Sequence, residues 1–107
     1  MVGERMNWDH KKNKYKIVLV GHKDEVHPLT PSGGARHHES NSMGELWVIA
    51  REALDWERCK MVVFYERQGK NFGRPIELMK PEDYIYCMGT GRDPMPYSIR
   101  ERLSKGR

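Results

Sequence analysis

The sequence predicts an α+β fold in which one amphipathic helix, at about residues 43–57, packs on a small, mainly antiparallel sheet. Two observations lead to this prediction. A helical pattern with a start signal follows one strand-like run, and several apolar runs with short connections come after it. Consecutive strands with short connections favour antiparallel pairing. At 107 residues one domain is expected, and we place it at 14–96, between a basic, flexible segment at 1–13 and a basic segment at 97–107.

The first strand is expected at residues 14–22, KYKIVLVGH, where β-branched residues alternate with others and Gly21 ends the run. Residues 23–42 are rich in proline and glycine, so we expect one long loop there. Loops longer than about 12–15 residues are usually functional or disordered. This loop is therefore the first place to look for a site.

The helix has the clearest local signal in the chain. Ser42 and Glu45 have the spacing of a capping box, in which the serine caps backbone N–H groups and the glutamate reaches back. The apolar residues that follow at the spacing of one helical face are Leu46, Ile49, Ala50, Ala53 and Leu54.

The segments after the helix are predicted to be mostly strands. A buried strand is expected at 59–67, and the glycine and asparagine of QGKNFG after it are typical of a hairpin connection. Residues 74–79 are expected to form a short edge strand, because Pro75 cannot donate to a ladder. Residues 81–89 are expected to begin with a turn and end in another apolar strand, and 97–107 to form a short basic helix.

The formal net charge of +4 is unevenly placed. Residues 1–16 and residues 91–107 each carry five basic and two acidic residues, whereas residues 17–90 carry nine basic and eleven acidic ones. Basic ends can contact phosphate or an acidic partner, and they can equally be solvated tails.

The composition argues against several classes of protein. No run approaches the roughly 18–20 apolar residues of a membrane span, and the charged start lacks the apolar stretch of a secretory signal, so we expect a cytoplasmic protein without a membrane partner. Cys59 and Cys87 each adjoin an apolar run, which predicts buried thiols rather than a disulfide framework. The cysteine spacing is not that of a zinc site, and we expect neither a metal nor a cofactor.

The segment PSGGARHHESNS, residues 31–42, is the leading candidate for a site because it precedes the helix. The start of a helix presents free N–H groups and a positive dipole end, which bind anions. Glycines permit close backbone approach, and an arginine can hold a phosphate through two hydrogen bonds. The glycine spacing is not that of a P-loop. The residues assigned to this site are Gly33, Gly34, Arg36, His37 and Ser40.

The same segment contains the residue types that cleave a phosphodiester. Such a reaction needs a cation together with groups that donate and accept protons. The segment has an arginine, two histidines and a glutamate for these roles. However, neighbours in an extended segment point to opposite sides, so adjacent histidines do not readily face one substrate. A metal site in this run is disfavoured as well, since its spacing is weak. The set in question is Arg36, His37, His38 and Glu39.

Two further stretches carry basic residues. GTGRDP places Arg92 after two glycines, either as an anion contact near Arg36 or in an ordinary turn. In KNFGRP, alternation is expected to put a lysine, a phenylalanine and an arginine on one side of a hairpin, which suits base stacking beside phosphate contacts. The alternative there is a phenylalanine that folds back on the core. These three residues are Lys70, Phe72 and Arg74.

The leading hypothesis from the sequence is a non-catalytic protein that binds an anionic ligand, either a nucleotide or a nucleic-acid phosphate. The first alternative is a small inhibitor or adaptor that binds another protein, which exposure of Trp47, Trp56 or Phe72 on a flat patch would favour. The third hypothesis is a small metal-independent ribonuclease. So polar a domain can also complete its core across a symmetric interface, as a homo-oligomer.

Overall fold

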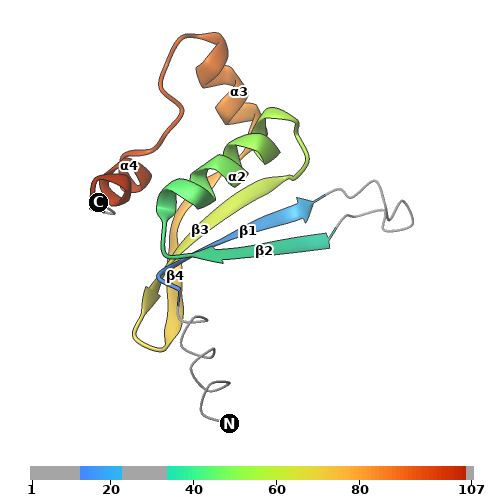
Figure 1. The fold of residues 1–107 in the computed structure, drawn as a ribbon. Coiled ribbons are helices and arrows are strands. Elements are labelled where there is room, and N and C mark those ends of the chain that lie inside the picture. Colours follow the sequence, from blue (N-terminus) through green and yellow to red (C-terminus); the bar gives the residue numbers. More distant parts are fainter. Residues whose placement is uncertain (1–12, 23–33, 106–107) are drawn as a thin grey trace.

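The computed structural model describes residues 13–22 and 34–105. This part of the chain forms a four-stranded antiparallel sheet with three helices, all on one side of the sheet (Figure 1). The α+β class expected from the sequence is therefore confirmed, with a mainly antiparallel sheet as predicted.

The sheet has the strand order β2-β1-β3-β4. Strands β1 (Tyr15–His22) and β3 (Met61–Gln68) form its centre. Strands β2 (Gly34–Ser40) and β4 (Asn71–Met79) form its edges. The hairpin between β3 and β4 turns at Gly69, whose φ of +68° suits a residue without a Cβ. Pro75 is tolerated because β4 has a neighbour on one side only.

The core lies between the sheet and α2 (Met43–Asp55), which runs along it. The rings of Trp47 on α2 and Phe64 on β3 pack with their centroids 6.3 Å apart. Helices α3 (Pro81–Gly89) and α4 (Tyr97–Lys105) lie beside α2, and each contributes a buried residue, Tyr84 and Ile99. The central strands contribute Tyr15, Ile17, Leu19, Val62 and Phe64 to this core.

One correction concerns the expected loop at 23–42. Its second half, residues 34–40, is strand β2, and residues 23–33 lie outside the described part. GARHHES lacks the alternation of apolar and polar residues that predicts a strand. An edge strand with few side chains packed against it can form without that alternation. Backbone pairing with β1, from Tyr15–Ser40 to Leu19–Arg36, holds it in the sheet.

A second correction concerns residues 81–89, which form helix α3 and not a strand. Pro81 lies in the first turn, where its missing N–H is not needed, and Glu82 and Asp83 follow at the positive end of the helix. The apolar run YIY looked like a strand, but helical spacing buries Tyr84 and leaves Ile85 partly exposed. The structure thus has three helices in its described part where the sequence predicted one on the sheet and a short basic one.

The start of α2 confirms the predicted cap and adds a residue to it. The Ser42 hydroxyl accepts a hydrogen bond from the Glu45 backbone N–H at 3.2 Å. The Glu45 carboxylate accepts from the Ser40 hydroxyl at 3.0 Å, and this hydroxyl accepts from the Ser42 N–H at 2.9 Å. The glutamate therefore reaches back through Ser40 and ties the end of β2 to the helix start.

The end of α2 closes with a left-handed residue that is not glycine. Glu57 has a φ of +52°. The Arg58 N–H donates to the Ala53 carbonyl at 2.9 Å, and the Glu57 N–H donates to the Leu54 carbonyl at 3.3 Å. This pair of bonds is the Schellman motif, in which the left-handed position usually holds glycine because a Cβ is strained there.

We expect Glu57→Gly to raise the free energy of unfolding by about 1 kcal/mol, because glycine takes the left-handed conformation without strain. Glu52→Gly is the matched control: the same exposed side chain is removed from the helix interior, which costs about 1 kcal/mol. Urea denaturation measures both. A loss of stability in both variants would contradict the inference that Glu57 is strained in the left-handed conformation.

Candidate functional site

The face of the sheet opposite the helices carries alternate residues of every strand. Residues paired across antiparallel strands have their side chains on the same face, so the registers assign this face directly. We call it the helix-free sheet face, since all three described helices lie on the other side (Figure 1). Its residues are Lys16, Val18, Val20, His37, Glu39, Met61, Val63, Tyr65, Arg67, Phe72, Pro75 and Leu78.

Two cations lie over two aromatic rings on this face. The Lys16 ammonium is 4.8 Å from the centroid of the Tyr65 ring and 4.7 Å from that of Phe72. The Arg67 guanidinium carbon is 4.4 Å from the Phe72 centroid. These distances are within the range of cation–π attraction. We call these four residues the cation–aromatic cluster.

Arg67 is held in place by the backbone around it. Its Nε donates to the Asn13 carbonyl at 2.7 Å, and its Nη1 donates to the Lys70 carbonyl at 2.8 Å. Its Nη2 lies 3.9 Å from the Glu39 carboxylate. The guanidinium is therefore oriented across Phe72 before any ligand arrives, while Glu39 offsets part of the positive charge.

An apolar strip adjoins the cluster. Val18 and Val63, paired in register, are 8% and 5% exposed, yet neither belongs to the core cluster on the other side of the sheet. Leu78, paired with Val63, is 54% exposed. The helix-free sheet face thus combines aromatic, basic and apolar side chains.

The residues of the predicted loop site are divided by strand β2. His37 pairs with Val18 and Glu39 with Lys16, so both lie on the helix-free sheet face. Arg36 pairs with Leu19 and His38 with Ile17, so both lie on the side of the core. The set proposed for a ribonuclease is therefore split between two faces by the alternation of an extended chain.

Arg36 and His38 line a pocket of about 250 Å³ beside the second half of α2. Glu52 of α2 and Arg58 beyond its end lie in the same pocket. The expectation that Arg36 lies at the start of the helix is wrong, because the strand runs antiparallel to β1 and places Arg36 near the helix C-terminus. The partial negative charge there favours cations rather than an anionic ligand.

The other members of the predicted loop site lie elsewhere. Gly33 is outside the described residues, and Gly34 begins β2. Ser40 is close to the helix start, but its hydroxyl already bonds with Glu45 and Ser42. The structure therefore does not bring Arg36 and the N-terminus of α2 into one anion site.

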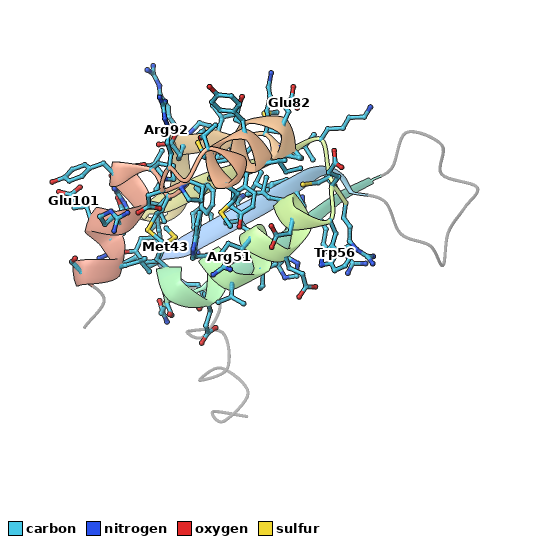
Figure 2. The ribbon with its side chains drawn as sticks, turned by 90° about the horizontal axis from the view of Figure 1, so that it is seen from above. Met43, Arg51, Trp56, Glu82, Arg92 and Glu101 are labelled. Carbon is cyan, nitrogen blue, oxygen red and sulfur yellow. The ribbon has the colours of Figure 1, made fainter. Side chains whose placement is uncertain are left out.

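The GTGRDP stretch is the end of helix α3. Gly91 has a φ of +76°, and the Arg92 N–H donates to the Cys87 carbonyl at 2.8 Å, as in a Schellman motif. The Asp93 carboxylate pairs with Arg100 and accepts from the Met95 N–H at 2.9 Å. The exposed Arg92 lies beside α3 (Figure 2), and its segment contributes nothing to the pocket of Arg36.

The KNFGRP stretch is only partly arranged as predicted. Phe72 does not belong to the core cluster, and it lies on the helix-free sheet face. Lys70 is in the hairpin turn. The register shifts between the Arg67–Phe72 and Tyr65–Pro75 pairs, so the strict alternation that was expected to align Lys70, Phe72 and Arg74 is interrupted.

Lys16, Tyr65 and Arg67 are not among the site residues predicted from the sequence. Lys16 was counted with the basic N-terminal region, although it alternates with Ile17 within the first strand. Tyr65 and Arg67 belong to the segment 59–67, for which the sequence predicts a buried strand. Alternation within VFYER was the available signal, because the strand changes from apolar to amphipathic after Phe64.

Two groups have shifted pKa values. Partial burial, then the charge of Arg36 and then that of His37, lowers the pKa of His38 below its ordinary value. Burial raises the pKa of the Cys59 thiol, which makes it less reactive. Both cysteines are free, with Cys59 buried and Cys87 half-buried.

Comparison of the chain with protein families, curated protein sequences and solved structures finds no match. Within residues 13–22 and 34–105, no three His, Cys, Asp or Glu side chains are grouped as a metal site requires. No helix in this same part of the chain is long and apolar enough to cross a membrane. The geometry of the helix-free sheet face is therefore the main basis for a functional proposal.

We expect His38 to titrate below its ordinary pKa of 6.5. The unfolded chain then binds a proton more readily than the folded protein, so His38 makes stability fall as the pH decreases from about 6.5 through the lowered pKa. Arg36→Gln removes one cause and brings the pKa of His38 closer to its ordinary value. NMR titration of the imidazole measures both pKa values, and titration at or above the ordinary value would contradict the partial burial of His38.

Proposed function

We propose that the protein binds single-stranded nucleic acid on the helix-free sheet face without cleaving it. The observation that carries the proposal is the cation–aromatic cluster of Lys16, Tyr65, Arg67 and Phe72. Bases of single strands stack on aromatic rings, while lysine and arginine beside the rings contact the phosphates.

The position of the rings supports recognition of a strand rather than of a duplex. Tyr65 and Phe72 lie on the adjacent strands β3 and β4, and the sheet around them is not covered by any described helix. Each ring can stack with an unpaired base once Lys16, which lies over both rings, moves toward the phosphate. Bases within a duplex are already stacked on one another, so they are not available for such contacts.

The charge of the face supports binding that depends more on stacking than on phosphate contacts. Lys16 and Arg67 supply two positive charges, and Glu39 supplies a negative charge 3.9 Å from Arg67. This near balance gives modest electrostatic attraction. The net charge of +4 for the whole chain adds a further long-range attraction for polyanions.

We propose binding without catalysis because the set Arg36, His37, His38 and Glu39, predicted for a ribonuclease, is divided between the two faces of the sheet. A phosphodiester held over Phe72 would share a face with His37 and Glu39, while Arg36 and His38 are on the side of the core. The proposed ligand remains a nucleic acid, as the sequence suggested. The proposed binding site is now the helix-free sheet face and not the start of the helix.

We expect Phe72→Leu to weaken binding of a fluorescein-labelled oligouridylate or oligothymidylate by about tenfold, since a stacked base contributes about 1–3 kcal/mol. Tyr86→Leu is the control, because Tyr86 is an exposed aromatic residue on α3, on the other side of the sheet. Fluorescence anisotropy at low salt measures the affinities. Equal affinity in Phe72→Leu and the wild type would refute stacking on this ring.

Two substitutions test the phosphate contacts, one that removes a positive charge and one that removes a negative charge. Lys16→Gln is expected to weaken binding and to lower the salt dependence by about 0.7 in the logarithmic slope. Glu39→Gln is expected to strengthen binding, because it removes the carboxylate beside Arg67. Arg92→Gln, at the end of α3, serves as a control that leaves affinity at low salt nearly unchanged. Weaker binding by Glu39→Gln would contradict the proposed path of the phosphates.

A protein partner is the second candidate, and exposed side chains on the helices favour it. Trp56 after α2, and Tyr86 and Tyr97 on α3 and α4, are large and exposed. Trp47, by contrast, is buried. Complexes that persist during co-purification and are lost in Trp56→Ala would support a protein partner, whereas binding that is lost in Phe72→Leu belongs to the helix-free sheet face.

A further inference from the structure

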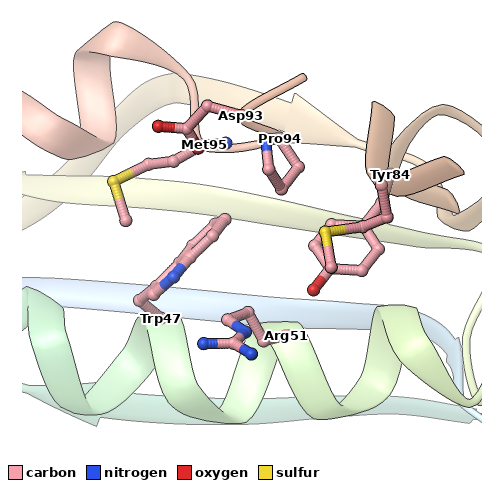
Figure 3. Close-up of a pocket in the computed structure, with 7 residues that line it drawn as sticks. Trp47, Arg51, Tyr84, Asp93, Pro94 and Met95 are labelled. Carbon is pink, nitrogen blue, oxygen red and sulfur yellow. Dashed lines mark hydrogen bonds between the residues drawn. The ribbon is translucent and has the colours of Figure 1, made fainter. Parts of the chain in front are cut away.

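A pocket of about 300 Å³ lies on the helical side of the molecule, between α2, α3 and the connection to α4 (Figure 3). Its volume is at the low end for small-molecule sites, which span about 300–1,000 Å³. It is separate from the helix-free sheet face, from which the sheet itself divides it. The lining residues are Trp47, Arg51, Tyr84, Met88, Asp93, Pro94 and Met95.

Helical spacing brings the walls of this pocket together. Trp47 and Arg51 are four residues apart on α2, and Tyr84 and Met88 are four residues apart on α3, so each pair lies on one helical face. Pro94 and Met95 close the pocket from the connection between α3 and α4. The walls are thus mainly apolar and include an indole ring.

The Tyr84 hydroxyl is one hydrogen-bond donor in this pocket without a partner. Tyr84 is only 1% exposed, and its hydroxyl has no hydrogen-bond partner in the structure. Figure 3 shows this hydroxyl pointing from α3 toward α2. A buried hydroxyl without a partner destabilises a fold, so an acceptor from a ligand would satisfy a group that the described protein leaves unsatisfied.

The Arg51 guanidinium is another such donor. It is exposed and forms no hydrogen bond or ion pair with another residue of the described part. The one carboxylate in the pocket, that of Asp93, is already engaged by Arg100 and by the Met95 N–H. Two donors without acceptors, one of them cationic, complement an anionic group.

We propose that this pocket binds a small aromatic carboxylate. The aromatic part would pack against Trp47 and the methionines, and the carboxylate would accept hydrogen bonds from Arg51 and Tyr84. Access to the buried hydroxyl requires a shift of a neighbouring side chain. Met88 and Met95 are unbranched, and such side chains change rotamer at low cost.

The test uses the full chain and 2-naphthoate, with neutral 2-naphthalenemethanol as the comparison ligand. Isothermal titration is expected to show that the wild type binds the carboxylate more tightly than the alcohol. Arg51→Gln should weaken naphthoate binding by about tenfold and affect the alcohol little. Arg58→Gln, which removes an exposed arginine outside this pocket, should change neither affinity.

Tyr84→Phe separates a ligand-binding hydroxyl from a merely structural one. Removing the unpartnered hydroxyl should leave the unfolding midpoint unchanged or higher, while naphthoate binding falls by about fivefold. The proposal would be overturned if the wild type did not bind naphthoate. It would also be overturned if Tyr84→Phe and Arg51→Gln both bound naphthoate with the affinity of the wild type. Phe72→Leu should retain naphthoate binding. The proposed pocket ligand and the proposed nucleic-acid binding are therefore tested independently of each other.

Discussion

Every described helix packs on one side of an antiparallel sheet, and this one-sided packing decides which residues form the core and which remain on the opposite face. Successive side chains of a strand point to opposite faces, so each residue that enters the core sends its neighbour to the other side. Phe64 packs against Trp47 of α2, and Tyr65 therefore lies beside Lys16 on the helix-free sheet face. Core and candidate site are two consequences of the same registers.

The same constraint decides which basic residues act together. Lys16, Arg67 and Phe72 come from three neighbouring strands, and backbone pairing places the Lys16 ammonium 4.7 Å and the Arg67 guanidinium carbon 4.4 Å from the centroid of the Phe72 ring. Arg36 and His38, adjacent in sequence to His37 and Glu39, are sent to the side of the core. Residues adjacent in a strand therefore lie on opposite faces of the sheet, whereas residues paired across neighbouring strands lie on the same face.

Signals carried by single segments were sufficient for much of the fold. The cap at Ser42 and the apolar spacing from Leu46 to Leu54 predicted α2, and the run of Val62 to Phe64 predicted β3. Strand β2 was not predictable in this way, because its hydrogen bonds with β1 depend on a partner distant in sequence. For α3, Pro81 and the acidic first turn were usable signals that the apolar run from Tyr84 to Tyr86 obscured.

The candidate site was less predictable than the fold. Phe72 was identified from its basic neighbours Lys70 and Arg74, but the residues that lie beside it, Lys16 and Arg67, depend on the strand order and the bulges of β4. Tyr84 and Arg51 likewise line one pocket only because α3 packs beside α2. Sequence periodicity shows which face of an element is apolar, and it does not show which elements become neighbours.

The most direct test of the account is an NMR titration of the aromatic side chains with unlabelled oligouridylate. Tyr65 and Phe64 are consecutive on β3 and point to opposite faces, so they report separately on the two sides of the sheet. Binding on the helix-free sheet face should shift the ring signals of Tyr65 and Phe72 and leave those of Phe64 and Tyr84 unchanged. Shifts confined to Phe64, Tyr84 and the helices, with Tyr65 and Phe72 unchanged, would contradict it.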